Sequence, residues 1–405
     1  MSASSSKDWA MKEFIREHLG DDPMRLLLDA KHYPQVDVPF AVEQIAARRQ
    51  IKEKLPTWYA NEELLFPSKL SAEQCSSEQT AAYKQRLVQA QDTLYDLTGG
   101  LGIDSFFFSQ KVARLTYVER FEKYCDMARH NFEALQASNI TVCHADATDL
   151  LPHLSATDVI YVDPARRGNA DKRVYALSDC EPNLPLLLDR MLEISPKIIA
   201  KLSPMADIQH TLSLLPDTTS VHVLSVKNEC KELLFVVERP KEEAIQATTL
   251  HVHCVNYTSA GTEQSFTFTR EEEQTATADY AEKVRTYLYE PNASLLKAGA
   301  FQCLAVRMGV QKLHKNSHLY TSDTLLHDFP GRRFAVQTVY PFSGKLCKTI
   351  AKEVSKANLT VRNFPIKTEE LRKRTKIKEG GECYLFATTL LSEEKVLIAC
   401  EQIFG

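Results

Sequence analysis

Strand-like and helical segments alternate through the middle of this 405-residue chain. The apolar runs of strand length cover residues 93–97, 113–119, 140–146, 158–163 and 197–202. Helical stretches lie between several of these runs, and parallel strands need connections of that length. The alternation therefore predicts an α/β fold built on a Rossmann-like, doubly wound parallel sheet.

Two later strand-like runs, residues 220–226 and 232–238, are separated only by the polar link KNECK. This link is too short for a helical crossover, so we expect the two strands to pair antiparallel. A parallel sheet that ends in an antiparallel hairpin is unusual for nicotinamide-binding domains and usual for class I methyltransferases. The hairpin therefore favours the methyltransferase type of sheet.

A glycine-rich turn with a carboxylate on either side follows the first strand: Asp96, Gly99, Gly100, Gly102 and Asp104. Such a turn between a strand and a helix is typical of nucleotide-like cofactor sites. A nicotinamide fingerprint that began at Gly100 would need its third glycine at Ser105. Carboxylates would also repel a pyrophosphate, whereas the ammonium and sulfonium groups of S-adenosylmethionine (SAM) attract them. The turn therefore predicts SAM as the cofactor.

Acidic residues also end the next two strands. Glu119 lies twenty residues after Gly99, at the spacing where an acid hydrogen-bonds the ribose hydroxyls. Asp146, which Ala147 follows, is placed to accept a hydrogen bond from the exocyclic amine of adenine. Because consecutive strand ends meet at one edge of a parallel sheet, we expect these residues to share one cofactor site.

The fourth strand ends in Asp163 and Pro164, beside the expected methyl donor. Many methyltransferases that act on amino groups carry Asn/Asp-Pro-Pro-aromatic here, where the acid and a prolyl-held carbonyl accept hydrogen bonds from the target amine. This chain has Ala165 for the second proline and Arg166 for the aromatic residue. Arg166 or Arg167 would stack on a base or bind a phosphate, unless both pair with nearby acids.

The order Asp-Pro-x-Arg-x-Gly also occurs in uracil carbon-5 RNA methyltransferases. Those enzymes need a cysteine nucleophile after the next strand, where this chain has Leu202 in the segment KLSP. Leucine cannot add to a pyrimidine ring, and Cys230, after the sixth strand, is a poor substitute. The sequence therefore favours direct in-line methyl transfer, with donor and target held close together.

Basic residues concentrate near the C-terminus. From Lys345 to Lys378 there are eleven Lys and Arg against three Glu, although the whole chain has a net charge of −4. Lys345, Lys348, Lys352 and Lys356 recur at helical spacing, which predicts one basic helix face that binds phosphates. The alternative is a solvated charged surface.

The ten cysteines are scattered, with no CxxC pair and no Cys/His cluster. We therefore expect reduced thiols, a cytoplasmic location and no metal site. His314 and His318 lack a third ligand nearby, so they do not indicate a metal. The sequence contains no run of roughly 18 uncharged apolar residues, so we expect no transmembrane helix. The N-terminus does not resemble a signal peptide.

Several motifs together resemble a bacterial family of class I SAM-dependent methyltransferases with a THUMP-like C-terminal domain: LSAEQCSSEQTAAYK, DLTGGLGID, DPARRG, KLSPMAD, NECKELL, LYEPNASLLKAGAF and LHKNSHLYTSD. The resemblance implies four parts along the chain. They are a helical region (1–85), the methyltransferase domain (86–240), a small ferredoxin-like α+β region (241–328) and the THUMP-like domain (329–405).

A long helix that Ser71 would cap is also expected before the first strand. By the family resemblance this helix lies over the cofactor, with Gln79 or Thr80 near its methionine end. THUMP domains accompany RNA-modifying enzymes, so the resemblance implies RNA as the partner. The predicted function is SAM-dependent methylation of a base in structured RNA. The alternatives are a protein or small-molecule methyltransferase, and a SAM-binding RNA-binding module without catalysis.

Overall fold

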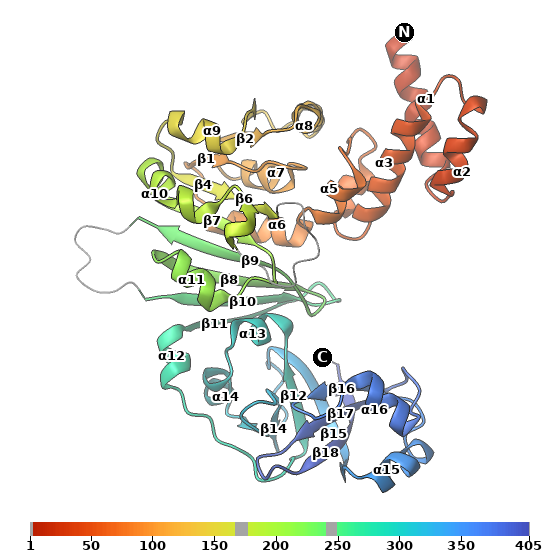
Figure 1. Ribbon diagram of the computed structural model, residues 1–405, viewed down its shortest axis with the longest axis vertical. Coiled ribbons are helices and arrows are strands. Elements are labelled where there is room, and N and C mark those ends of the chain that lie inside the picture. The colour runs from red at the N-terminus through yellow and green to blue at the C-terminus, as the bar shows by residue number, and fades with distance from the viewer. Residues whose placement is uncertain (1–2, 167–176, 240–248, 405) are drawn as a thin grey trace. The chain divides into compact units, whose positions relative to one another are not determined.

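The computed structural model describes residues 3–166, 177–239 and 249–404 (Figure 1). The chain forms two compact units. The first comprises Met1–Thr218 and Leu234–Ala244, and the second comprises Thr219–Leu233 and Ile245–Gly405. Arg167 of the sequence analysis lies outside the described residues.

Helices form the N-terminal part of the first unit, as predicted. They are α1 (Ala3–Glu17), α2 (Pro23–Leu28), α3 (Val38–Ile51), α4 (Pro56–Ala60), α5 (Lys69–Gln74) and α6 (Glu78–Lys84). The single long helix expected after Ser71 is wrong. Ser68 caps α5, with Ser71 as its capping-box partner, and Ser77 caps α6 by accepting a hydrogen bond from the Thr80 backbone N–H. A second cap three residues after α5 ends starts a new helix instead of extending the first.

A parallel sheet follows these helices and confirms the predicted alternation. Its strands, in the order β7-β4-β1-β2-β3, are β7 (Lys197–Leu202), β4 (Val159–Val162), β1 (Thr93–Asp96), β2 (Arg114–Glu119) and β3 (Ile140–His144). The helices between and after them are α7 (Ile103–Ser109), α8 (Glu122–Ala134), α9 (Ala147–Leu150), α10 (Leu184–Ile194) and α11 (Ile208–Leu214). Leu94, Phe108, Tyr117 and Tyr161 lie in the buried core of this sheet.

A short two-stranded sheet forms directly after β4. It pairs β5 (Ala165–Arg166) antiparallel with β6 (Cys180–Glu181). The chain therefore turns back beside the end of the fourth strand, and this return brings Glu181 and Pro182 into the site described below.

The predicted antiparallel hairpin is confirmed. Strands β8 (Thr218–Val226) and β9 (Glu229–Glu238) are sheet neighbours joined by Lys227 and Asn228, with φ angles of 52° and 62°. Positive φ at both loop residues is the backbone of the tight turns that join antiparallel strands. Strand β10 (His251–Tyr257) runs parallel to β8, and β11 (Glu263–Thr269) pairs antiparallel with β10.

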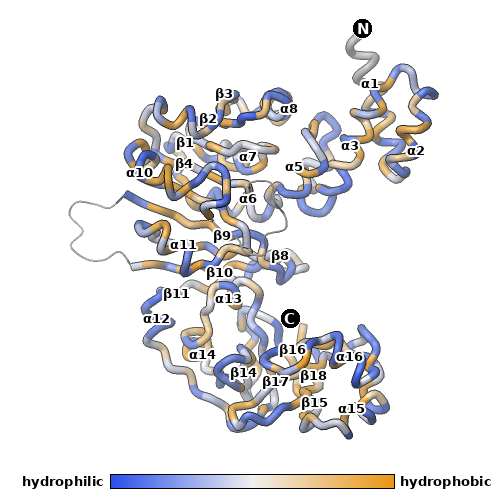
Figure 2. Tube along the Cα trace, in the orientation of Figure 1, coloured by the Kyte–Doolittle hydropathy of each residue, from blue (hydrophilic) through white to orange (hydrophobic). Residues whose placement is uncertain are grey.

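The second unit also contains a seven-stranded sheet in the order β13-β14-β12-β15-β18-β17-β16. These strands are β12 (Tyr287–Pro291), β13 (Gln311–Lys312), β14 (Tyr320–Ser322), β15 (Gly331–Pro341), β16 (Asn358–Arg362), β17 (Cys383–Thr389) and β18 (Lys395–Ile403). Its helices are α12 (Arg270–Thr275), α13 (Ala293–Ala298), α14 (Gln302–Met308), α15 (Gly344–Thr349) and α16 (Thr368–Thr375). Apolar residues run along many of the strands, as the orange stretches in Figure 2 show.

The basic helix expected near the C-terminus is shorter than predicted. Lys345 and Lys348 lie on α15, and Lys352 ends the 3₁₀ turn Ile350–Lys352. Lys356 lies beyond both, in an isolated β-bridge with Lys378. Ile350 is buried, and the chain enters strand β16 at Asn358. The helix therefore ends before Lys356, and the four lysines do not share one helix face.

No helix among the described residues has both the length and the apolar character to cross a membrane. Within the same ranges, no three or more His, Cys, Asp or Glu side chains are grouped so that they could hold a metal ion.

Candidate SAM site and methyl-transfer site

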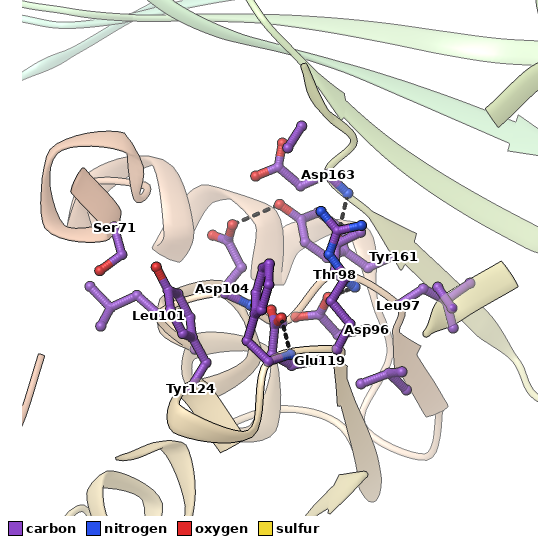
Figure 3. A pocket seen from close by; sticks show the side chains of 18 of the residues that line it. Ser71, Asp96, Leu97, Thr98, Leu101, Asp104, Glu119, Tyr124, Tyr161 and Asp163 are labelled. Atoms are coloured by element: carbon purple, nitrogen blue, oxygen red, sulfur yellow. Dashed lines mark hydrogen bonds between the residues drawn. The ribbon is translucent and has the colours of Figure 1, made fainter. Parts of the chain in front are cut away.

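A cavity of about 280 Å³ lies at the carboxyl ends of strands β1, β2 and β4 in the first unit (Figure 3). It brings together most of the cofactor and transfer residues expected from the sequence: Asp96, Gly99, Gly100, Gly102, Asp104, Glu119, Asp146, Ala147 and Asp163. Residues far apart in the chain meet here because parallel strands end at the same edge of the sheet.

The glycine turn has no room for side chains at two positions. A Cβ atom on Gly99 would lie 2.2 Å from the Tyr117 ring, and one on Gly102 would lie 2.9 Å from Phe132. Gly102 also has a φ of +82° and caps α7, a backbone conformation that residues other than glycine rarely adopt. The Tyr117 hydroxyl donates a hydrogen bond to the Gly100 carbonyl at 2.6 Å. The turn is therefore held against the sheet with its backbone facing the cavity.

Asp96 ends β1 at the bottom of the turn. It is 1% exposed, and it accepts hydrogen bonds from the Thr98 backbone N–H (3.0 Å) and the Ser105 hydroxyl (2.5 Å). Burial raises the pKa of Asp96 to about 7, because the charged carboxylate loses its hydration. A cationic group that binds beside Asp96 would favour the ionised form. Ser105, where a nicotinamide fingerprint would need glycine, thus supports the carboxylate instead.

Asp104 is engaged by several polar groups. Its Oδ1 atom lies 3.0 Å from Lys84 Nζ, and its Oδ2 atom accepts hydrogen bonds from Ser76 (2.8 Å) and Tyr161 (2.6 Å). Lys201 Nζ lies 3.7 Å from Oδ2. Burial acts to raise the pKa of Asp104, but the two lysines and the tyrosine hold it well below its usual range. Asp104 is therefore ionised but compensated, so it attracts a cation less than the sequence alone suggested.

Glu119 lines the cavity, and each of its carboxylate oxygens accepts a hydrogen bond from a backbone N–H group. Oε2 accepts a hydrogen bond from the Gly100 backbone N–H (3.0 Å) and Oε1 accepts one from the Phe121 backbone N–H (2.9 Å). Each oxygen has a second lone pair, so Glu119 retains the capacity to accept two hydroxyl groups. Phe121 lines the cavity beside it and is 53% exposed, with the Arg120 guanidinium 4.9 Å from the centre of its ring.

Asp146 caps α9 and also lines the cavity. Its Oδ1 atom accepts a hydrogen bond from the Thr148 backbone N–H at 2.8 Å. The Ala147 side chain is buried beside it. The cap fixes one oxygen of Asp146 and leaves acceptor capacity on the carboxylate for an amine.

The end of the fourth strand adjoins the glycine turn. The Asp163 backbone N–H donates a hydrogen bond to Thr98 Oγ1 at 2.7 Å, and Asp163 Oδ2 lies 2.6 Å from Lys201 Nζ. Pro164 is buried and does not line the cavity, whereas Ala165 does. Arg166 lies on β5, in register with Cys180. The backbone at the end of the fourth strand is thus hydrogen-bonded to the glycine turn, and the Asp163 carboxylate is paired with Lys201.

Gln79 and Thr80, which the sequence analysis placed near the methionine end of the cofactor, do not line the cavity. Gln79 is exposed, and Thr80, which is 1% exposed, bonds back to Ser77 in the first turn of α6. The wall is formed instead by residues just before them: Leu70, Ser71, Gln74, Cys75 and Ser76. The break between α5 and α6 causes this shift.

Sequence reasoning also missed Lys201, Tyr124, Tyr161, Glu181 and Pro182, all of which line the cavity. Lys201 lies in the segment KLSP, which the sequence analysis read only for its lack of cysteine. A signal was nevertheless present in the sequence. Lys201 lies one residue before the end of a predicted parallel strand, and the ends of such strands gather at the edge of the sheet where Asp163 lies.

Neither Leu202 nor Cys230 can provide the cysteine nucleophile that a covalent uracil mechanism needs. Leu202 is 1% exposed. Burial raises the pKa of the Cys230 thiol to about 11, so the nucleophilic thiolate is scarce at neutral pH.

The fold and the site together define a class I SAM-dependent methyltransferase domain. A crystal structure of a methyltransferase-family protein from Porphyromonas gingivalis W83 is 36% identical to this chain, with a TM-score of 0.87, and the match covers 98% of this chain and 99% of that one. The chain belongs to this family of SAM-dependent methyltransferases. Residues 287–330 match a model described as a ferredoxin-like domain, and residues 331–402 match one described as THUMP domain-like.

Two curated relatives from Mycobacterium tuberculosis strains, both described as uncharacterised SAM-dependent methyltransferases, are 26% identical over 197 residues. The match covers 48% of this chain and 52% of each relative, so the chain spans about half the length of these curated relatives.

Proposed function

We propose that this protein transfers a methyl group from SAM to a base in structured RNA. The observation that carries the methyl-transfer part is the 2.7 Å hydrogen bond from the Asp163 backbone N–H to Thr98 Oγ1, which joins the end of the fourth strand to the glycine turn at the cavity that Asp163 also lines. Transfer by direct in-line displacement requires donor and target to be held side by side, and the closeness of Asp163 to the glycine turn supports this mechanism.

The residues at the cavity fit SAM. Gly99 and Gly102 lie so close to the rings of Tyr117 and Phe132 that the turn presents its backbone to the cavity, and Asp96 and Glu119, which also line the cavity, retain acceptor capacity. Asp96 would face the methionine end, Glu119 the ribose, and Asp146 with Ala147 the adenine. When bound, SAM supplies an electrophilic methyl group on a sulfonium. Asp163 then accepts a hydrogen bond from the target group and orients it.

RNA as the substrate rests on the second unit. A THUMP-like match supports it, because THUMP domains accompany RNA-modifying enzymes. The expected phosphate contacts, Lys345, Lys348, Lys352 and Lys356, are all exposed. Although they are not on one helix, cationic side chains need no regular spacing to neutralise phosphates. Arg166 and Arg167 would contact the target nucleotide.

The proposed domain division follows the sequence boundaries at residues 85, 240 and 328. We also propose that the protein acts in the cytoplasm, where its ten cysteines, which form no disulfide, would stay reduced.

The test is transfer of tritiated methyl from SAM to total RNA from a strain that lacks this protein. Wild type should give nuclease-sensitive label, and Asp163→Ala should lose it while still binding SAM. Label in protein instead of RNA would favour a protein methyltransferase. No label in any fraction, with SAM binding intact, would favour an RNA-binding module without catalysis.

A further inference from the structure

Lys201 connects three separate parts of the cavity wall. It lies one residue before the end of β7 and is 8% exposed. Its Nζ atom is 2.6 Å from Asp163 Oδ2, 3.3 Å from Ser76 Oγ and 3.7 Å from Asp104 Oδ2. The contact with Asp163 is much the shortest of the three, so Lys201 acts mainly on the acceptor carboxylate.

A second buried lysine holds the cofactor side of the same network. Lys84 is 0% exposed and lies 3.0 Å from Asp104 Oδ1. Asp104 also accepts hydrogen bonds from Ser76 and Tyr161. Asp104 would therefore keep its closest cation and two hydroxyl donors if Lys201 were replaced. The closest carboxylate to Lys84 is therefore Asp104, in the first turn of α7, whereas the closest carboxylate to Lys201 is Asp163.

Asp163 needs such support because its side chain is 36% exposed and only its backbone is tied to Thr98. In the Asp-Pro-Pro-aromatic motif, a second proline would stiffen the chain directly after the acid. Here that residue is Ala165, which lacks the restriction. An ion pair that fixes one carboxylate oxygen leaves the other to accept from the target.

We infer that Lys201 is a positioning residue that holds the Asp163 carboxylate in the orientation used for methyl transfer. It would do so in place of the second proline of the motif, where this chain has Ala165. This inference rests on the proposed function for its role in transfer. The ion pair and its independence of the cofactor are tested without any substrate.

The first experiment is a double-mutant cycle on thermal unfolding, with Lys201→Met, Asp163→Asn and the double variant, each without ligand. Each single variant should lower the apparent Tm. The double variant should lower it by less than the sum of the two, because both remove the same pair. Additive shifts would overturn the inference, since they would mean that the two residues do not support each other.

SAM affinity, measured by calorimetry, separates the two lysines. Lys201→Met should raise the Kd for SAM less than loss of Lys84 does, because the closest contact of Lys201 is with Asp163 and its contact with Asp104 is the longest of its three. The matched variant Lys84→Met should weaken SAM binding more strongly, because it removes the 3.0 Å contact that holds Asp104 in the first turn of α7, directly after the glycine turn. Equal weakening by both variants would overturn the inference, since Lys201 would then act on the cofactor turn.

Methyl transfer to RNA gives the third readout. Lys201→Met should lower kcat about 100-fold, the loss expected when a reacting group is misplaced by about 1 Å. Lys201→Arg should recover part of this loss, and Lys201→Met should have no further effect in the Asp163→Asn background. Full activity of Lys201→Met would overturn the inference. If wild type does not label RNA, the RNA proposal fails, and the unfolding cycle and the SAM affinities still decide the role of Lys201.

Discussion

The ring of Tyr117 lies directly against Gly99, so closely that a Cβ atom added to the glycine would sit 2.2 Å from the ring. The same tyrosine donates its hydroxyl hydrogen to the Gly100 carbonyl at 2.6 Å. The Tyr117 side chain on β2 therefore fixes the distance between the glycine turn and the sheet. The turn cannot move closer to the sheet without a clash with this ring.

This contact predicts that Gly99→Ala displaces the turn. We expect a loss of about 1–3 kcal/mol in the free energy of unfolding, the usual cost of overpacking, together with weaker SAM binding. Gly20→Ala is the matched control because nothing lies within 4 Å of the added Cβ atom. Urea unfolding and calorimetry measure the two effects. A Gly99→Ala protein as stable as the control, with unchanged SAM affinity, would show that the turn adapts freely.

The buried carboxyl group of Asp96 predicts that stability decreases toward neutral pH. Its pKa is about 7 in the folded chain, against a usual 3.8. A raised pKa contributes stability that is complete below the unfolded value and is lost as the pH rises through the folded value. Relative to Asp96→Asn, which does not titrate, wild type should lose up to about 4 kcal/mol between about pH 4 and pH 7. Parallel pH curves for the two proteins in urea unfolding would contradict this.

SAM binding should show the opposite dependence on pH. A cationic ligand favours the ionised form of Asp96, so the affinity should rise with pH and level off above about pH 7. Calorimetry in buffers of different ionisation enthalpy should detect release of a proton below that pH. Asp96→Asn should bind SAM more weakly and with a flat profile. A pH-dependent Asp96→Asn protein would assign the titration to another group.

The buried pair of Lys84 and Asp104 predicts a large loss of stability on Lys84→Met. Removing one partner of a buried pair leaves an uncompensated charge, at a typical cost of about 3–5 kcal/mol. Lys201 offsets part of this cost, since it lies 3.7 Å from Asp104 Oδ2. The control is Lys123→Met, which breaks a partly exposed pair with Glu43 and should cost at most about 1 kcal/mol. Urea unfolding that ranked the two variants equally would be inconsistent with a buried pair.

The sequence predicted the sheet, and it predicted that several acidic residues would meet at one cavity, because both depend on local pattern. Asp96 and Glu119 end strands β1 and β2, and Asp146 follows the end of β3 by two residues; parallel strands place such ends together at one edge of the sheet. Lys84 and Lys201 could not be found in this way. Lys84 looks like an ordinary lysine in the sequence, and only the packing of α6 brings its ammonium group to Asp104. Lys201 lies one residue before the end of β7, and the pairing of β7 with β4 places it beside Asp163.

Two errors of placement arose from helix boundaries. No proline or glycine marks the break at residues 75–77, so one helix was expected where Ser77 starts a second one. Lys356 likewise continues a helical spacing in the sequence, but the chain leaves the helix to bridge Lys378 at the sheet. In the first case the cap at Ser77 divides the helix, and in the second the bridge to Lys378 overrides the helical spacing.

RNA binding through the exposed lysines of the second unit should depend steeply on salt. Each lysine that contacts a phosphate contributes about 0.7–0.9 to the slope of log affinity against log salt concentration. Replacing Lys348 and Lys352 together by alanine should therefore reduce the slope by about 1.4–1.8 and weaken binding similarly for all RNA sequences. The matched control replaces Lys31 and Lys283, which are also exposed but lie outside the basic segment. Filter binding to total RNA at several salt concentrations measures both slopes. If the two double variants gave the same slope, the basic segment would be a solvated surface, and the substrate would have to be recognised at the cavity alone.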